Sequence, residues 1–238
     1  MRMLSNYEKR RANHYNQYSR WYDNQRNSGF YSLINKLEIK KIMPYVRNKK
    51  VLEIGCATGI ILDKLRKHTS FLRGIDISPE MIKIAKRKGL KVVLSDVVSI
   101  PFKDKTFDVV FSLKTLPHVE NIRKAISEIS RVTKNNGHIF LDFYNPYSFK
   151  CLSVFVKGLI INRGIFIRHD TLPKIKNYIP NNLSIESVSG IRIFTPSTFI
   201  YNIPLLKDLF DYLEGRFCDS YFKYFGSYLL IKLKKNDY

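Results

Sequence analysis

The sequence has little of several features that would place it in a particular class of protein. Its three cysteines are odd in number and far apart along the chain, which suits neither a disulfide framework nor a zinc cluster, so no metal is expected and a reducing cytoplasm is predicted. The first residues are too charged for a secretory signal. The most apolar stretch, residues 151–161, is interrupted by Lys157 and falls short of the roughly 20 residues that cross a membrane.

Acidic residues are also scarce. The chain of 238 residues has 20 Asp and Glu against 41 Lys and Arg, a net charge of +21. Such an excess suits an anionic partner, either RNA or an anionic lipid surface. It equally suits a lysine-rich composition spread over the whole surface, because no compact run resembles an RNA-binding tail. Residues 1–50 carry the densest positive charge, so that segment is where a phosphate group would bind.

Glycine is sparse even where a nucleotide site would need it. Gly55 and Gly59 flank Cys56-Ala57-Thr58 directly after the apolar segment VLEI, without the G-x-G-x-x-G or GK[ST] patterns of dinucleotide and phosphate loops. The turn therefore suits a ligand without phosphate, which the backbone can approach closely because glycine has no Cβ. The alternative is a tight turn with a purely structural role.

Apolar segments alternate with amphipathic ones along the first two thirds of the chain. A partly helical arm over 7–27 and a helix over 30–43, ended by Pro44, precede this alternation. Asn136 and Gly137 predict a turn into the fifth strand. Apolar strands that alternate with helices predict a doubly wound α/β sheet. Strands are predicted at 50–54, 71–76, 91–95, 107–112 and 138–143, and helices at 60–67, 79–87 and 121–132.

The C-terminal third is less regular. It predicts a helix over 147–157, a strand over 185–194, an amphipathic helix over 204–217 and a last strand over 227–234. Neither a repeat nor a Gly/Ser linker divides the chain, so a single domain is predicted. Its parts are an N-terminal arm and helix (1–46), a ligand-binding core (47–145), a substrate-side region (146–226) and a final strand (227–238).

Two aspartates follow the glycine turn at intervals that suit a nucleoside. Asp76 ends the second predicted strand, about twenty residues past the turn, where a carboxylate can accept both ribose hydroxyls. Asp96 follows the third strand, where it would meet an adenine amino group. A helix-capping role for Asp76 and an ordinary strand-end role for Asp96 are the alternatives. The three features at successive strand ends are more specific together than any one of them.

Four segments resemble successive motifs of the class I S-adenosylmethionine (SAM)-dependent methyltransferases: VLEIGCATG, GIDISPEMIKIAK, SDVVSIPFKDKTFDVVFSLKTLPHV and EISRVTKNNGHIFLDF. The resemblance spans residues 47–145 and is closest to the small-molecule group that contains the ubiquinone and menaquinone biosynthesis enzymes. HYNQYSRWYD resembles the arm that precedes the domain in that group, and Ala57 stands where the family has a middle glycine. The resemblance implies SAM as cofactor and a seven-stranded, mostly parallel sheet in the order 3-2-1-4-5-7-6, with the last strand antiparallel.

The resemblance also implies roles for particular residues. Four residues near the glycine turn would frame the methionine end of SAM. Asp76 would bind the ribose, Ile77 would lie beside the adenine, and Asp96 and Val97 would bind the adenine edge. Ser112 would offer its carbonyl to the SAM amino group, and Tyr22 of the arm would close over the carboxylate. The residues implied at the methionine end are Glu53, Gly55, Cys56 and Gly59.

The acceptor side is less constrained by the sequence. His118, just past the fourth strand, is the first candidate for a general base because its pKa can lie near neutral pH. Asp142 and Tyr144, at the end of the fifth strand, are second candidates. Each of the three could instead have a structural role.

The motif of nucleic-acid amino methyltransferases is missing after the fourth strand, which reads Ser112-Leu113-Lys114-Thr115. We therefore expect a methyltransferase that acts on a small molecule, apolar or presented at a membrane surface, with an RNA methyltransferase as the alternative.

Overall fold

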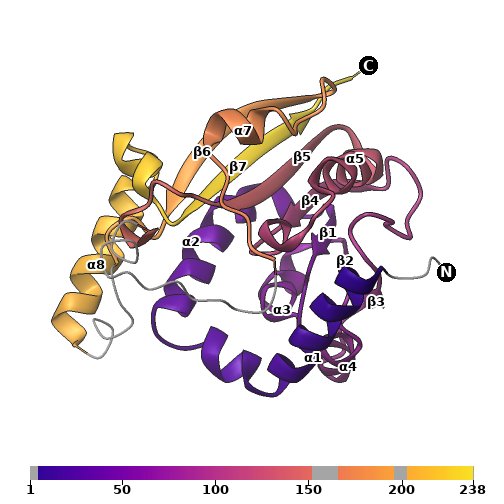
Figure 1. The fold of residues 1–238 in the computed structure, drawn as a ribbon, viewed down its shortest axis with the longest axis horizontal. Coiled ribbons are helices and arrows are strands. Elements are labelled where there is room, and N and C mark those ends of the chain that lie inside the picture. Colours follow the sequence, from indigo (N-terminus) through magenta and orange to yellow (C-terminus); the bar gives the residue numbers. More distant parts are fainter. Residues whose placement is uncertain (1–4, 152–165, 196–202, 238) are drawn as a thin grey trace.

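The computed structural model describes residues 5–151, 166–195 and 203–237, which contain a seven-stranded sheet in the order β3-β2-β1-β4-β5-β7-β6 (Figure 1). Strands β1 to β5 run parallel, and β7 runs antiparallel to both β5 and β6. The predicted order and the antiparallel last strand are therefore confirmed. The strands are β1 (Lys50–Ile54), β2 (Phe71–Asp76), β3 (Val92–Leu94), β4 (Phe107–Ser112), β5 (Thr133–Tyr144), β6 (Leu183–Ile191) and β7 (Tyr228–Lys235).

Helices cover both faces of the sheet, and α1 lies outside these two layers, packed against α2 and α4 (Figure 1). The α5 and α7 helices pack on one face, while α2 and α3 pack on the other. The α-helices are α1 (Asn6–Arg26), α2 (Gly29–Val46), α3 (Ile60–Leu65), α4 (Pro79–Arg87), α5 (Ile122–Val132), α7 (Leu172–Lys176) and α8 (Pro204–Phe217). The 3-10 helices are η1 (Arg66–His68), η2 (Leu116–His118) and η4 (Tyr221–Phe225).

The N-terminal arm is more ordered than the sequence predicted. It forms one helix of 21 residues, which begins with a reciprocal capping box between Ser5 and Glu8. The prediction that Pro44 ends the next helix was wrong, because α2 continues to Val46. Proline so near the end of a helix removes only one backbone hydrogen bond, and the fully buried Ile42 and Val46 hold the last turn against the sheet.

The predicted turn at Asn136 and Gly137 was also wrong. The fifth strand begins earlier, at Thr133, and Asn136 has a φ of 60° inside it. The pairing of β4 with β5 shifts at this point, and a Cβ on Gly137 would lie 2.9 Å from the carbonyl oxygen of Asp108. The residues that suggested a turn therefore form an irregularity that lets two strands approach closely.

The C-terminal third follows the prediction in outline. The α8 helix has the predicted bounds. Its predicted apolar face is partly exposed to solvent, with Leu205 81% exposed and Leu209 49% exposed. Beyond residue 151, the helix predicted over 147–157 lies outside the described residues. Within the described ranges, no helix has the length and apolarity that a membrane span requires.

The sixth strand ends three residues before its predicted end, because the backbone N–H groups that follow it donate to a buried carboxylate. The N–H groups of Ile193, Phe194 and Thr195 donate to Glu214 of α8 at 2.7 to 2.9 Å, and the Thr195 hydroxyl donates at 2.9 Å. Glu214 has no exposed surface. This side chain therefore joins α8 to the end of the sheet.

Replacing that carboxylate should destabilise the protein far more than replacing an exposed one on the same helix. Glu214→Ala leaves buried N–H groups without acceptors, so we expect the free energy of unfolding to fall by about 3 kcal/mol. Asp208→Ala, at an exposed position of α8, should change it by less than about 0.5 kcal/mol. Urea denaturation of both variants measures the difference, and equal effects would contradict this role of Glu214.

Candidate functional site

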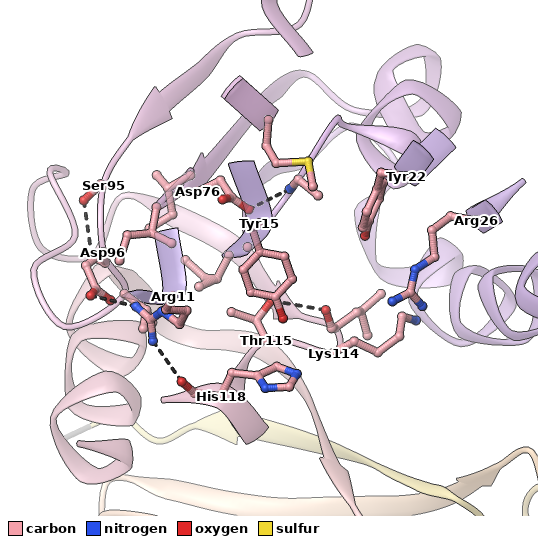
Figure 2. A pocket seen from close by; sticks show the side chains of 18 of the residues that line it. Arg11, Tyr15, Tyr22, Arg26, Asp76, Ser95, Asp96, Lys114, Thr115 and His118 are labelled. Carbon is pink, nitrogen blue, oxygen red and sulfur yellow. Dashed lines mark hydrogen bonds and ion pairs between the residues drawn. The ribbon is translucent and has the colours of Figure 1, made fainter. Parts of the chain in front are cut away.

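A cavity lies at the carboxyl ends of β1, β2 and β4, and the inner face of α1 crosses it from end to end (Figure 2). This is where open α/β sheets bind their ligands. A smaller second lobe adjoins it and shares Tyr22, Arg26, Gly55, Leu113 and Lys114 with it. Of the residues predicted for the site, the main cavity is lined by Tyr22, Gly55, Asp76, Ile77, Asp96, Val97, His118 and Tyr144, and the second lobe by Glu53 and Cys56.

The glycine turn after β1 forms the floor of the cavity. Gly55 has a φ of 72°, and a Cβ there would lie 1.9 Å from the Thr115 hydroxyl oxygen. Gly59 has a φ of 81° and is the N-cap residue that precedes α3. Ala57, which replaces the family's middle glycine, also adopts a positive φ of 46°. The turn therefore has left-handed backbone at three positions although only two of them are glycines, at the cost of some strain in Ala57.

Asp76 joins this turn to the end of β2. One carboxylate oxygen accepts the Ala57 N–H at 2.8 Å, and the other accepts the Ser78 N–H at 2.8 Å. Burial raises the pKa of Asp76 above its usual value, although these two hydrogen bonds oppose the shift. Each carboxylate oxygen has a second lone pair, so the side chain can still accept hydroxyl groups from a ligand in the cavity.

Asp96 lies at the opposite end of the cavity from Tyr22 (Figure 2). Its carboxylate pairs with the guanidinium of Arg11 at 2.8 Å, and both side chains are 6% exposed. Arg11 also donates to the backbone carbonyl of His118 at 3.1 Å. The carboxylate of Asp96, which is predicted to contact the adenine of the cofactor, is therefore already paired with an arginine of α1.

The acceptor-side candidates His118 and Tyr144 meet at the wall of the cavity. His118 is the last residue of η2, and its Nδ1 lies 3.0 Å from the carbonyl oxygen of Phe166. Its Nε2 lies 3.4 Å from the hydroxyl of Tyr144, at the end of β5. Burial raises the pKa of Tyr144 well above its usual value, so this phenol stays protonated near neutral pH.

Asp142, Ser112 and Gly59 line neither of the two lobes. Asp142 has no exposed surface, and its carboxylate accepts the backbone N–H of Lys114 at 2.6 Å. Burial, followed by the nearby Glu38, raises the pKa of Asp142 to about 7. The fully buried Ser112 donates its hydroxyl to the Ile54 carbonyl at 3.3 Å. Asp142 therefore supports the loop after β4, and its role as a base stays a prediction.

Among the lining residues that were not predicted are Arg11, Tyr15, Arg26 and Lys114. With Tyr22, the first three share one face of α1, because positions 11, 15, 22 and 26 are separated by four, seven and four residues. That spacing was visible in the sequence. Lys114 has a φ of 58°, which local sequence patterns do not reveal. Its ammonium group pairs with Glu38 of α2 beneath the cavity.

Comparisons with known proteins agree with this architecture. Residues 52–141 match the family described as "Methyltransferase domain". An uncharacterised protein of Methanocaldococcus jannaschii is 31% identical over 201 residues, which cover 78% of this chain and 75% of that protein. The ubiquinone biosynthesis O-methyltransferase of Coxiella burnetii is 26% identical over 192 residues, 75% of this chain and 79% of that one.

Among solved structures, a SAM-dependent methyltransferase from Thermotoga maritima, described as a possible histamine N-methyltransferase, has a TM-score of 0.68 at 17% identity. The two structures align over 96% of this chain and 99% of the other, and at this identity the likeness supports the fold alone. Together with the family match, the fold and the ordered strand-end residues, these relatives identify the chain as a member of the class I SAM-dependent methyltransferases.

The chain is thus a methyltransferase enzyme whose cofactor is SAM, and the residues of the cavity fit that molecule. Asp76 presents carboxylate oxygens at the middle of the cavity, where the ribose would lie, and Asp96 lies at the adenine end (Figure 2). At the other end, one oxygen of Glu53 is buried without a hydrogen-bond partner, which suits an amino group of a ligand. The roles of individual residues toward SAM stay predictions.

A methyl group on Gly55 should damage the site. Gly55→Ala places a Cβ against Thr115 and forces alanine to a φ of 72°, so we expect a lower melting temperature and at least about tenfold weaker binding of S-adenosylhomocysteine. Gly215→Ala is the matched control, because nothing lies within 4 Å of its Cβ and alanine favours the helix interior. Isothermal titration and thermal melting check both, and unchanged binding by Gly55→Ala would count against this turn as the floor.

Removing the central carboxylate should weaken cofactor binding. Asp76→Ala removes an acceptor for ribose hydroxyls and for the turn, so we expect SAM and S-adenosylhomocysteine to bind about tenfold to a hundredfold more weakly. Asp63→Ala, on the exposed side of α3 beyond the same turn, should leave both affinities unchanged. Titration calorimetry measures them, and wild-type affinity in Asp76→Ala would remove Asp76 from the site.

Proposed function

We propose that the enzyme transfers a methyl group from SAM to a hydroxyl group of a small, apolar or ring-containing acceptor. The observation that carries this proposal is the orientation of His118 at the cavity wall. A carbonyl oxygen only accepts hydrogen bonds, so Nδ1 of His118 must carry the proton that is shared with Phe166. In a neutral imidazole this leaves the lone pair on Nε2, and Nε2 is the atom that faces Tyr144.

That arrangement suits the removal of a proton from a hydroxyl group. A hydroxyl keeps its proton near neutral pH and gains most from a base that is already oriented. Tyr144 is held protonated by its raised pKa, so we assign it the role of positioning the acceptor and His118 the role of base. The apolar part of the wall supports an acceptor with a ring, because Tyr15 and Tyr144 both pack edge-on against the His118 ring.

When bound, SAM would supply a methyl group on a positively charged sulfur for in-line transfer to the acceptor oxygen, with the neutral thioether S-adenosylhomocysteine as the leaving group. The protein must then hold the acceptor oxygen in line and receive its proton, and orientation alone can account for several kcal/mol of the barrier. In this proposal Tyr144 orients the acceptor oxygen and Nε2 of His118 receives the proton. Methylation of an oxygen is also the activity in the name of the C. burnetii relative.

An RNA acceptor remains the alternative, and its support is the net charge of +21. Arg11, from the densely charged N-terminal segment, is already engaged by Asp96. The predicted presentation of the acceptor at a membrane surface rested partly on residues 151–161, of which all but Cys151 lie outside the described residues. Transfer to RNA is therefore measured beside transfer to small molecules.

A variant that lacks the general base should lose methyl transfer but still bind the cofactor. Using SAM with a radiolabelled methyl group, we expect transfer to phenols or catechols and not to total tRNA or rRNA. His118→Gln should lower kcat by about 10²- to 10⁴-fold and abolish the rise of the rate with pH, while S-adenosylhomocysteine binding stays within about twofold. Tyr144→Phe should raise KM more than it lowers kcat.

His68→Gln, at an exposed histidine of η1, is the matched control and should keep the wild-type rate. Full activity and an unchanged pH profile in His118→Gln would rule out the base. Label incorporated into RNA alone, with strong dependence on salt, would replace the small-molecule proposal with the RNA alternative.

A further inference from the structure

Arg11 is a buried side chain of α1 that bonds to two walls of the cavity (Figure 2). It is 5% exposed. One guanidinium nitrogen, Nη2, pairs with the carboxylate of Asp96 at 2.8 Å, and the other, Nη1, donates to the backbone carbonyl of His118 at 3.1 Å. A guanidinium group is planar and its N–H donors have fixed directions, so a bond to one partner orients the donor for the other. Arg11 therefore connects the loop after β3 to η2.

The η2 helix depends on hydrogen bonds from other parts of the chain. It has three residues, and the internal hydrogen bonds of such short 3-10 helices have poor geometry. The carbonyls of Pro117 and Val119 accept from the backbone N–H and the side chain of Arg168, at 2.9 and 3.1 Å. The carbonyl of His118, between them, accepts from α1 instead. Two separate segments of the chain thus hold η2 in place.

Tyr7 of α1 bonds to the same carbonyl as Arg11. Its hydroxyl donates to the His118 carbonyl at 2.7 Å, and burial raises the pKa of Tyr7 to about 12, so the phenol keeps its proton near neutral pH. Positions 7, 11 and 15 are four residues apart and share one face of α1. Tyr15 packs edge-on against the ring of His118, with ring centres 6.1 Å apart. One face of α1 therefore contacts both the backbone and the ring of His118.

The backbone of His118 determines where its ring can lie. Nδ1 is 3.0 Å from the carbonyl oxygen of Phe166, and Nε2 is 3.4 Å from the hydroxyl of Tyr144. Both distances depend on the position in which η2 holds the residue. A displacement of about 1 Å can slow a reaction that depends on orientation by about a hundredfold. The bonds at the His118 carbonyl therefore bear on the chemistry although they do not touch the ring.

We propose that Arg11 is a positioning residue for methyl transfer, which links Asp96 to η2 and thereby holds the His118 ring toward the acceptor. Its effect on the rate rests on the proposed role of His118 as the general base, whereas its effect on the orientation of the ring does not. Asp96 can serve the cofactor at the same time. Its second oxygen, Oδ1, accepts the Val98 N–H at 3.4 Å and has a further lone pair for a ligand. Loss of Arg11 should therefore affect transfer more than cofactor binding.

The first test separates turnover from binding. With a phenol or catechol that the wild type methylates, Arg11→Met should lower kcat by about tenfold to a hundredfold, while S-adenosylhomocysteine binding stays within about threefold. Arg11→Lys keeps a cation beside Asp96 and so protects the fold, and it should still lower kcat by about tenfold because one ammonium group does not orient two acceptors. Arg10→Met, at the exposed neighbouring arginine, is the matched control and should keep both quantities. Similar losses in kcat and in binding would show a general structural role and overturn the proposal.

The second test needs no acceptor. The chain has five histidines, and in ¹⁵N-labelled protein the ring nitrogens of His118 are assigned by comparison with His118→Gln. The wild type should show the proton on Nδ1, and both Arg11 variants should average between the two tautomers. An unchanged tautomer in both variants would overturn the proposal. A changed tautomer with an unchanged kcat would support the role of Arg11 and count against His118 as the base.

Discussion

The hydrogen bond from the Ala57 N–H to Asp76 holds the site together, because it joins the turn after β1 to the end of β2. The turn needs left-handed backbone at Gly55, Ala57 and Gly59, and alanine adopts that conformation with some strain. The buried carboxylate offsets that strain and also accepts the N–H of Ser78, which caps α4. One side chain therefore sets the floor of the cavity, the start of a helix and the position expected for the ribose.

The α1 helix completes what the sheet begins. The strands supply a floor that is open on one side, and α1 closes it through contacts with several separate elements. Asn16 accepts from the Ser78 hydroxyl at 2.6 Å, and Asp23 pairs with Lys88 at 2.6 Å and accepts from the Thr58 hydroxyl. Arg11 pairs with Asp96. A helix with low intrinsic amphipathicity is thus held by polar contacts at both ends of the cavity and by few apolar ones.

The sequence predicted the parts of the site that are local to strand ends. Gly55, Asp76 and Asp96 each follow an apolar strand, and in a parallel sheet such positions converge, so their grouping followed from the strand predictions alone. Arg11 and Arg26 required the register of α1 against the sheet, which periodicity does not give. Asp142 and Tyr144 lie two residues apart on the same face of β5, yet only Tyr144 lines the cavity, while Asp142 is fully buried and accepts the backbone N–H of Lys114. Whether a residue near the end of a strand reaches the cavity or is buried depends on packing, which the sequence pattern does not reveal.

The anchoring of α1 at two places also bears on the rate at which the enzyme can turn over. Its 21 residues form one continuous helix that is bonded through Arg11 to Asp96 and through Asp23 to Lys88, so loss of either contact leaves the other in place. A ligand in the cavity lies under this helix, so its entry and exit depend on how far α1 can move, and motions of this kind limit turnover in many enzymes.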